Sequence, residues 1–343
     1  MTEPLVEFGI AGFGYAFGED QDVATVAGDY VDDPERPIKW GYHTFHRAPD
    51  GVTASKMAAT AATKALSEVG IGAEQLDLIV VATSEMPEYP YWDTSAAVAR
   101  ELKIATTQTL LLNEGCACGV TGIGYVAGLM AIQPELDTIM FIAVNRVSEF
   151  HRNRMNVNNS VHSDGAVATI WKRGHKELRW LSTHQFTDPE FCDWFRTDYG
   201  GMVEPVPPQG WSSRQSPAGH VAVQAHFKKE PARLIAFAAQ LEQRVVDVVD
   251  GALKRAGLTR EDLKHVIYIN DAPDAIEDIA KPLGISLEHT NANLSVGHGH
   301  MGAADQLIAL GQHLQRGEIK TGDVVALCGI SIGMRWYCTL VRV

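Results

Sequence analysis

Two cysteines lie where a thiol could act as a nucleophile. The segment 113–130 reads NEGCACGVTGIGYVAGLM and places Cys116 and Cys118 between an apolar strand and a helix rich in glycine and alanine. The positive end of a helix dipole lowers the pKa of a thiol at its N-terminus, and backbone N–H groups at the same turn can form an oxyanion hole. Both cysteines could instead be small core residues, as most buried cysteines are. The spacing alone allows a nucleophile here and leaves that alternative open.

A second group of chemically active residues lies near the C-terminus, where residues 297–300 read Gly-His-Gly-His. His298 and His300 could be a metal pair, but no nearby carboxylate or cysteine completes a set at a familiar ligand spacing. The remaining cysteines, Cys192, Cys328 and Cys338, show no matching spacing either. The sequence therefore predicts no metal site.

One segment of the chain occurs twice, and a candidate catalytic group follows each copy. Residues 65–84 and 252–271 align without a gap, and five of the twenty positions are identical. Each copy has the pattern of a helix end, a glycine stop, a short turn and a buried strand. A single repeat of this size predicts two related halves that face each other, with the active site between them.

Composition excludes several classes of function. With an apolar fraction of 45% and a charged fraction of 21%, the chain has the composition of a soluble globular protein, and its net charge of −13 argues against nucleic acid as a partner. We expect no membrane span, because no apolar run reaches the length of about 18 residues that a span needs. The N-terminus lacks a signal-peptide pattern, and five cysteines fit a reducing compartment, so we expect a cytoplasmic protein.

Apolar strands alternate with helices of small residues, which is typical of an α/β protein. The predicted strands are 78–83, 109–112, 138–144, 166–171, 265–269, 324–329 and 336–342, and the predicted helices are 54–69, 120–132, 233–256 and 302–315. Residues 1–178 should form the half with the nucleophile. Residues 179–343 should form the second half, which starts with an irregular segment at 180–222. Four aromatic residues within 194–211 indicate an ordered covering loop.

Four motifs, in the order of the chain, resemble those of the thiolase superfamily, in particular the branch of β-ketoacyl-acyl-carrier-protein synthase III. GCACG (115–119) resembles the nucleophile turn of that family, and HSDGAVATIW (162–171) resembles its phenylalanine-Gly-Asp-Gly-Ala strand entry. GHMGAADQLIAL (299–310) resembles its Gly-Asn-Thr-Ser-Ala-Ala helix start, and GISIGMRWYCTLVRV (329–343) resembles its glycine-rich loop and closing strand. The resemblance implies a thiolase fold of duplicated α/β/α/β/α layered half-domains, a homodimer, and thioester substrates with no cofactor.

The chain departs from this family at two of its three catalytic positions. A condensing enzyme of the family presents Cys, His and Asn, with the His after a strand of the second half. Here that stretch is YINDAPDAI (268–276), which has no histidine, and the Asn position holds His300. Asp271 occupies the place of the missing histidine, or Asn270 does if the alignment shifts by one residue.

This exchange predicts acyl transfer. Cys–His–Asp is an arrangement that moves an acyl group to a hydroxyl, amine or thiol, whereas a carboxylate would repel the enolate of a decarboxylative condensation. We expect Cys116, or less favourably Cys118, to attack the thioester, His300 to act as base and Asp271 to hold the histidine. The resemblance adds a backbone loop at Gly329, Ser331 and Gly333 that could complete the oxyanion hole.

The predicted enzyme is an acyltransferase of natural-product biosynthesis. It takes the acyl group from acyl-CoA or an acyl carrier protein and passes it to a hydroxyl, or an amine, of a small molecule. A condensing synthase is the main alternative, since His298 or His162 could supply a donor for the enolate. The third alternative, a non-catalytic subunit, would usually lack the nucleophile.

Overall fold

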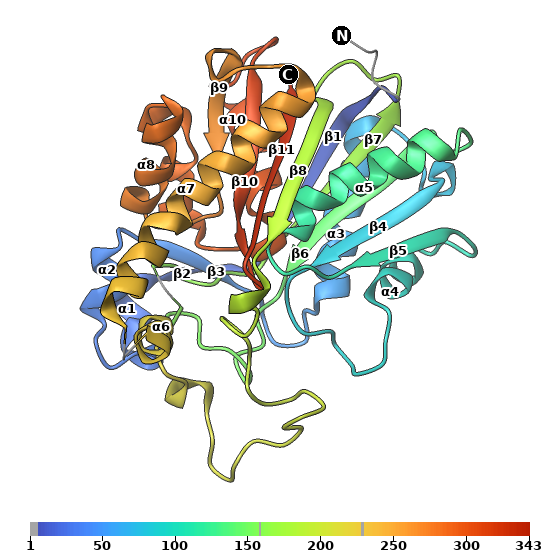
Figure 1. Ribbon diagram of the computed structural model, residues 1–343. Helices are drawn as coiled ribbons and strands as arrows, with labels where there is room; N and C mark the ends of the chain where they lie inside the picture. Colours follow the sequence, from blue (N-terminus) through green and yellow to red (C-terminus); the bar gives the residue numbers. More distant parts are fainter. Residues whose placement is uncertain (1–5, 158, 228–229) are drawn as a thin grey trace.

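The computed structural model describes residues 6–157, 159–227 and 230–343 and shows an α/β body around a large twisted sheet (Figure 1). Its strands are β1 (Phe8–Phe17), β2 (Glu19–Asp22), β3 (Thr44–Arg47), β4 (Leu78–Thr83), β5 (Gln108–Leu112), β6 (Thr138–Asn145), β7 (Gly165–Arg173), β8 (Arg179–Thr187), β9 (Leu263–Ile267), β10 (Val324–Ser331) and β11 (Arg335–Arg342). Its α-helices are α1 (Val23–Tyr30), α2 (Glu35–Lys39), α3 (Ala54–Val69), α4 (Thr94–Glu101), α5 (Cys118–Ile132), α6 (Gly219–Phe227), α7 (Pro231–Ala256), α8 (Pro273–Ala280), α9 (Ala292–His298) and α10 (Asp305–Gln315).

The main sheet consists of two halves with related strand patterns, and the first half has β5 as an additional edge strand. Its order in the described part of the chain is β5-β4-β6-β7-β1-β8-β11-β10-β9, and the halves meet where Gly9 of β1 pairs with Arg179 of β8. In the first half β4 runs parallel to β5 and β6, and β6, β7 and β1 are antiparallel. In the second half β9 runs parallel to β10, and β10, β11 and β8 are antiparallel.

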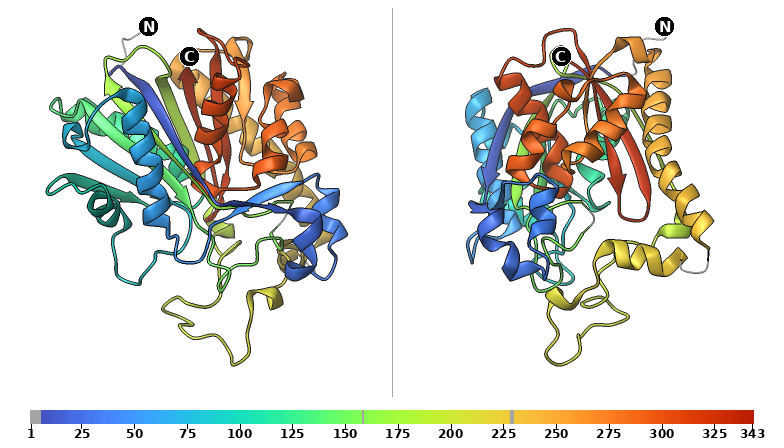
Figure 2. Two further views of the ribbon diagram at one scale, coloured as in Figure 1. Left: turned by 180° about the vertical axis from the view of Figure 1, so that it is seen from behind. Right: turned by 90° about the vertical axis from the view of Figure 1, so that its left-hand side faces the viewer.

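Helices cover both outer faces and fill the space between the half-sheets. Helix α3 packs on β1, β6 and β7, and α7 packs on β8, β10 and β11. Helix α5 contacts strands of both halves and also α10, so these two helices form the middle layer. Figure 2 (right) shows α7 and α3 at opposite edges of the molecule. The predicted α/β/α/β/α layering of a thiolase fold is confirmed.

The duplicated segment folds in the same way in both copies. Helices α3 and α7 end at Gly70 (φ 73°, ψ 35°) and Gly257 (φ 68°, ψ 30°), a left-handed conformation that glycine adopts at little cost. A short 3-10 turn follows in each copy, at Ala73–Gln75 and at Arg260–Asp262, and then β4 or β9. The prediction of related halves is therefore confirmed at the level of their elements. The predicted division after residue 178 falls in the connection from β7 to β8.

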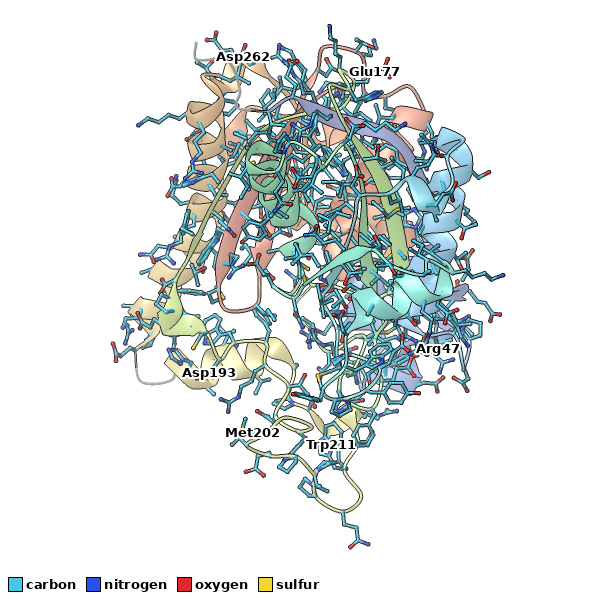
Figure 3. The ribbon with its side chains drawn as sticks, turned by 90° about the vertical axis from the view of Figure 1, so that its right-hand side faces the viewer. Arg47, Glu177, Asp193, Met202, Trp211 and Asp262 are labelled. Carbon is cyan, nitrogen blue, oxygen red and sulfur yellow. The ribbon has the colours of Figure 1, made fainter. Side chains whose placement is uncertain are left out.

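The predicted irregular segment 180–222 is partly wrong. Residues 179–187 form β8, a strand inside the sheet at the junction of the two halves. Residues 219–227 form α6. The remainder, about 188–218, contains only short 3-10 turns and extends beyond one end of the sheet. Figure 3 shows Asp193, Met202 and Trp211 on this segment.

The prediction that no apolar run reaches membrane length is also wrong. The window Gly115–Ile132 has a mean hydropathy of 1.6, enough by length and composition to cross a membrane, but 61% of it is buried inside the structure. A helix that is apolar all round is found in the core of a large protein as well as in a membrane. Here the window is α5 and the turn before it, in the middle layer of the fold.

Close packing of α5 positions the nucleophile turn. A Cβ on Gly119, in the first turn of α5, would lie 1.7 Å from the carbonyl oxygen of Ala303, which belongs to the turn before α10. We expect Gly119→Ala to lower the free energy of unfolding by about 1–3 kcal/mol, the usual cost of overpacking. Gly128→Ala, in the same helix with nothing within 4 Å, is the control and should be neutral or stabilising by about 0.5–1 kcal/mol. Chemical denaturation measures both, and equal effects would contradict this account of the packing.

Candidate active site

Cys116 and His300 lie side by side between the two halves of the fold. Cys116 is in the turn before α5, after Gly115 with φ +61°, and His300 follows Gly299, which has φ +66° after α9. The Cys116 Sγ is 3.1 Å from the His300 Nε2. This is the contact that a nucleophilic thiol and its base require.

The carboxylate that holds His300 is Asp305 and not Asp271. The Asp305 Oδ2 lies 2.5 Å from the His300 Nδ1 and also accepts the backbone N–H of Asn270 at 2.8 Å. The Asp305 Oδ1 accepts the N–H of Met301 at 2.6 Å. This contact directs the Nδ1–H of His300 to Asp305 and leaves Nε2 for Cys116. The prediction that Asp271 holds His300 is therefore wrong. Asp305, which lies in the first turn of α10 directly after the His300 turn, makes this contact.

The charges around His300 favour its imidazolium form. Burial alone would lower the pKa of His300. The negative charges of Asp305 and of a Cys116 thiolate, and the hydrogen bonds to both, outweigh that cost and raise the pKa of His300 well above its ordinary value. The geometry therefore places an imidazolium 3.1 Å from the Cys116 Sγ, where it can stabilise a thiolate, the reactive form of a cysteine.

Asp271 faces the same cavity, and its hydrogen bond is made to the backbone and not to the His300 ring. Its Oδ1 accepts the N–H of Ala272 at 2.8 Å, just before α8. Burial raises the pKa of Asp271 to about 7. The group is therefore a neutral acid below that pH and a carboxylate above it.

Asn270 has a supporting place beside the site. Its Nδ2 donates to the Gly299 carbonyl oxygen at 2.8 Å, and its Oδ1 accepts from Asn291 at 2.9 Å. Both ends of the amide are thus held by the protein, and its backbone N–H supports Asp305. The one-residue shift considered from the sequence does not place the Asn270 side chain on Cys116.

Cys118 is enclosed in the first turn of α5. Its Sγ donates to the Gly115 carbonyl oxygen at 3.0 Å, and burial raises the pKa of Cys118 to about 12. A thiol in this environment stays protonated. Of the two predicted nucleophiles, the structure thus places only Cys116 against a base.

The loop predicted for the oxyanion hole has three different roles. Ser331 Oγ donates to the Glu114 carbonyl oxygen at 2.8 Å and accepts the N–H of Ala117 at 3.2 Å, which fixes the nucleophile turn. Gly333, with φ +73°, forms the β10–β11 turn. At Gly329 a Cβ would lie 2.5 Å from the Tyr337 hydroxyl, so this glycine permits close packing. A backbone oxyanion hole in this loop stays a prediction.

His298 lies away from Cys116. Its Nδ1 is 2.8 Å from the His46 Nε2, its Nε2 is 2.9 Å from the Gln312 Oε1, and its ring stacks on Phe17. Within the residues that the structure describes, no three His, Cys, Asp or Glu side chains are grouped to hold a metal ion.

A cavity of about 400 Å³ opens at Cys116, and its wall is largely apolar. His300, Asp271, His162 and Ser331 reach it together with Cys116. Its apolar lining is Trp194, Phe195, Leu234, Phe237, Leu241, Tyr268, Ile269, Ile330 and Ile332. A second cavity, of about 730 Å³, shares Arg152, Val157, Trp194, Phe195 and Val223 with the first. The segment 193–226 therefore borders both, in line with the predicted covering role.

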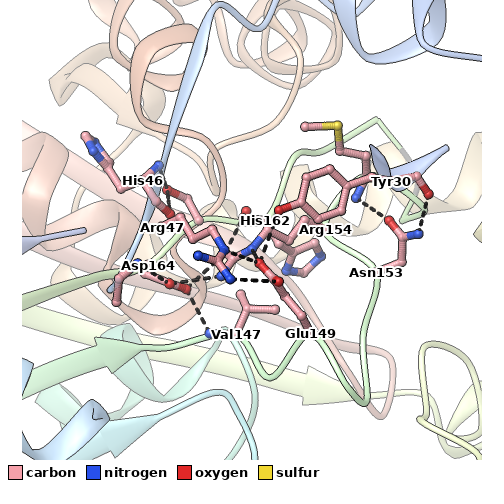
Figure 4. Close-up of polar contacts among 12 residues, drawn as sticks. Tyr30, His46, Arg47, Val147, Glu149, Asn153, Arg154, His162 and Asp164 are labelled. Carbon is pink, nitrogen blue, oxygen red and sulfur yellow. Dashed lines mark hydrogen bonds and ion pairs between the residues drawn. The ribbon is translucent and has the colours of Figure 1, made fainter. Parts of the chain in front are cut away.

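Two further buried acids, Asp305 and Asp164, lie near the site. Asp305 is the only acid inside the apolar motif GHMGAADQLIAL. This isolated acid is the signal by which the sequence could have identified it. Asp164 forms a fully buried double hydrogen bond with Arg154, at 3.0 and 2.9 Å (Figure 4). It also accepts the N–H groups of Ala48 and Val147. This network fixes the segment that carries His162 and does not itself reach Cys116.

Comparisons of sequence agree with this fold. Residues 253–343 match the family model of 3-oxoacyl-[acyl-carrier-protein (ACP)] synthase III, C terminal. The β-ketoacyl-[acyl-carrier-protein] synthase III of Rhodobacter capsulatus is 24% identical over 307 residues, which is 88% of each chain. The corresponding protein of Natranaerobius thermophilus is 26% identical over 305 residues, or 86% of each chain.

Solved structures show the same fold over nearly the whole chain. The acyltransferase ChlB3 matches with a TM-score of 0.83 and 22% identity, covering 98% of both chains. The 3-oxoacyl-(acyl carrier protein) synthase III of Pseudomonas aeruginosa PAO1 matches with a TM-score of 0.79 and 21% identity, also over 98% of both. The motifs, the duplicated fold and the sequence relatives taken together show a thiolase fold and a similarity to β-ketoacyl-acyl-carrier-protein synthase III.

Proposed function

We propose that the enzyme is an acyltransferase that carries an acyl group on Cys116, from the thioester of coenzyme A or a carrier protein to a hydroxyl or amine of a small molecule. The observation that supports this best is the line of contacts from Cys116 through His300 to Asp305. The similarity to the acyltransferase ChlB3 agrees with it. The acceptor is a natural-product intermediate in this proposal.

In the first half-reaction, the Cys116 thiolate attacks the thioester carbonyl carbon. The new bond joins Sγ to that carbon, and the bond from the carbon to the donor sulfur breaks as the intermediate collapses. His300, already protonated, gives its proton to the departing thiolate. The products are acyl-Cys116 and the free thiol of the donor.

Acylation prepares the second half-reaction electrostatically. Once Sγ is part of a thioester it carries no charge, so one of the groups that raise the pKa of His300 is lost. Neutral His300 can then take the proton of the acceptor hydroxyl or amine as its oxygen or nitrogen attacks the acyl carbon. Asp305 stabilises the imidazolium that forms.

The surroundings of Cys116 favour transfer over decarboxylative condensation. Condensation builds negative charge on an enolate oxygen, which needs hydrogen-bond donors beside the thioester. Asp271 faces this cavity together with the possible donors His162 and His300, and with a pKa of about 7 its carboxylate repels such a charge above neutral pH. The alternative of a condensing synthase is supported by the names of the sequence relatives and would be favoured below pH 7, where Asp271 is neutral.

The remaining expectations are part of the same proposal. A homodimer is supported by the edge strand β5 and by the exposed side chains of Met86 and Tyr89 in the loop after β4. The cytoplasm is the proposed location. A non-catalytic subunit is disfavoured, because the Cys116–His300–Asp305 line is complete.

Donor chemistry distinguishes transfer from condensation. After incubation with malonyl-CoA at pH 8, we expect intact-protein mass spectrometry to show a malonyl adduct on Cys116 and no carbon dioxide. The adduct should be absent in Cys116→Ala and present in Cys118→Ala. An acetyl adduct formed from malonyl-CoA would show decarboxylation and would replace this proposal by the synthase.

Thiol alkylation tests the ion pair. Iodoacetamide should modify Cys116 readily at pH 7 and leave Cys118 unmodified, because burial raises the pKa of Cys118 to about 12. In His300→Ala the thiol loses the cation beside it, so the rate at pH 7 should fall by about tenfold or more and recover at alkaline pH, where thiols ionise without help. An unchanged rate at pH 7 would contradict the thiolate–imidazolium pair.

Two matched substitutions identify the acid that serves His300. We expect Asp305→Asn to slow acylation of Cys116 by a factor on the order of 10⁴, as loss of the triad carboxylate does in serine proteases. Acylation of Asp271→Asn should stay within about tenfold of that of the unchanged protein, because the hydrogen bond to the His300 Nδ1 comes from Asp305 and that of Asp271 goes to the backbone. Single-turnover acylation with acetyl-CoA measures both. A reversed order would restore Asp271 as the partner.

A further inference from the structure

His162 is a buried histidine in the active-site cavity that has no hydrogen-bond partner among the described residues. Its exposed fraction is 3%, and neither ring nitrogen contacts a polar atom of the described residues. The ring lies edge-to-face with the His300 ring at a centroid distance of 5.1 Å. Together with Cys116 and His300 it lines the cavity in which the acyl-cysteine would form.

The backbone on both sides of His162 is held firmly. Its N–H donates to the Arg154 carbonyl oxygen at 2.8 Å, and Arg154 Nη1 donates to the His162 carbonyl oxygen at 3.3 Å. Val161 and Ser163 bond the backbone of His300 at 2.7 and 2.8 Å. Figure 4 shows His162 beside Arg154, which Asp164 and Glu149 hold in turn. These bonds hold the backbone of residue 162 at the wall of the cavity that it lines.

The ring is neutral, so it offers one donor and one acceptor. Burial, and then the charges of Arg152, His300 and Arg154, lower the pKa of His162 well below its ordinary value. Buried polar atoms of proteins are nearly always paired. A ligand made only of alkyl groups would leave both nitrogens unpaired, whereas an oxygen on the ligand would satisfy at least one of them.

A cationic side chain lies in the same wall. Arg152 reaches the cavity, and its Nε is 3.6 Å from the buried Glu85 carboxylate, too long for a hydrogen bond. Residue 162 is phenylalanine in the strand-entry motif that this segment resembles. Compared with that motif, His162 places a polar ring of similar size beside Arg152 where the family has an apolar ring. An oxygen atom of a ligand could accept hydrogen bonds from both side chains.

We propose that His162 is a specificity-determining residue that hydrogen-bonds an oxygen on the chain of the acyl group carried by Cys116. The substrates are thioesters of acyl groups with a hydroxyl, keto or carboxylate oxygen near the carbonyl, in preference to plain alkanoyl groups. The inference depends on acylation of Cys116, which the proposed function shares with its synthase alternative.

Four-carbon donors of matched length test the proposal. Rates of Cys116 acylation are measured on the full chain without acceptor, by quenching and intact-protein mass spectrometry, with butyryl-, 3-hydroxybutyryl-, acetoacetyl- and succinyl-CoA. We expect at least one oxygenated donor to exceed butyryl-CoA by about 10- to 100-fold, the value of one buried hydrogen bond. In His162→Phe that ratio should fall to about one, and His162→Gln, which keeps a donor and an acceptor, should retain most of it.

Iodoacetamide alkylation separates selectivity from damage to the site. It uses the same thiolate but carries no acyl chain, so its rate should be unchanged in His162→Phe. The proposal is overturned if His162→Phe keeps the selectivity of the unchanged protein, if that protein prefers butyryl-CoA, or if none of the four donors acylates it. Release of carbon dioxide from malonyl-CoA would instead refute the transferase and leave the role of His162 standing.

Discussion

The buried carboxylate of Asp305 is the interaction on which the site depends. It accepts hydrogen bonds from the His300 ring and from the backbone of Asn270 and Met301, and thereby joins the end of β9, the His300 turn and α10. A buried charge is costly unless it is paired and hydrogen-bonded, and Asp305 meets both conditions. Its position at the start of α10 also places the negative charge at the positive end of a helix dipole. The orientation of the His300 imidazole toward Cys116 is thus determined by Asp305 on the other side of the ring.

The two halves of the fold contribute different parts of the reaction. The first half brings the thiol at the start of α5, and the second brings the base and its acid at the start of α10. Both helices are in the middle layer, and the close approach of Gly119 to Ala303 brings their first turns together. The duplication therefore explains why groups 184 residues apart in the chain meet at 3.1 Å.

Much of this could be predicted from the sequence, because strong periodicity determines the elements that carry it. The predicted strand 78–83 and helix 54–69 have the same bounds in the structure, and Cys116 and His300 meet as expected. The strand β8 was missed because its burial is irregular and its sequence, RWLSTHQFT, lacks a clear period. Asp271 was predicted and Asp305 was missed, because alignment to a motif places residues along the chain and cannot give the direction of a side chain. The orphaned nitrogens of His162 emerge only from the packing around it.

The segment from about 188 to 218 lies outside the sheet and yet lines both cavities with Trp194 and Phe195. Its residues Phe191, Trp194 and Phe195 pack on the cluster under α7, and Ser213 donates to the Glu149 carbonyl oxygen, while much of the rest extends beyond the layered body. Substitutions in this segment can therefore accumulate at a lower cost in stability than substitutions in buried strands. Related enzymes with the same Cys–His–Asp contacts can thus differ in acceptor through changes in this one segment. Protein engineers could exchange the segment between such enzymes for the same purpose.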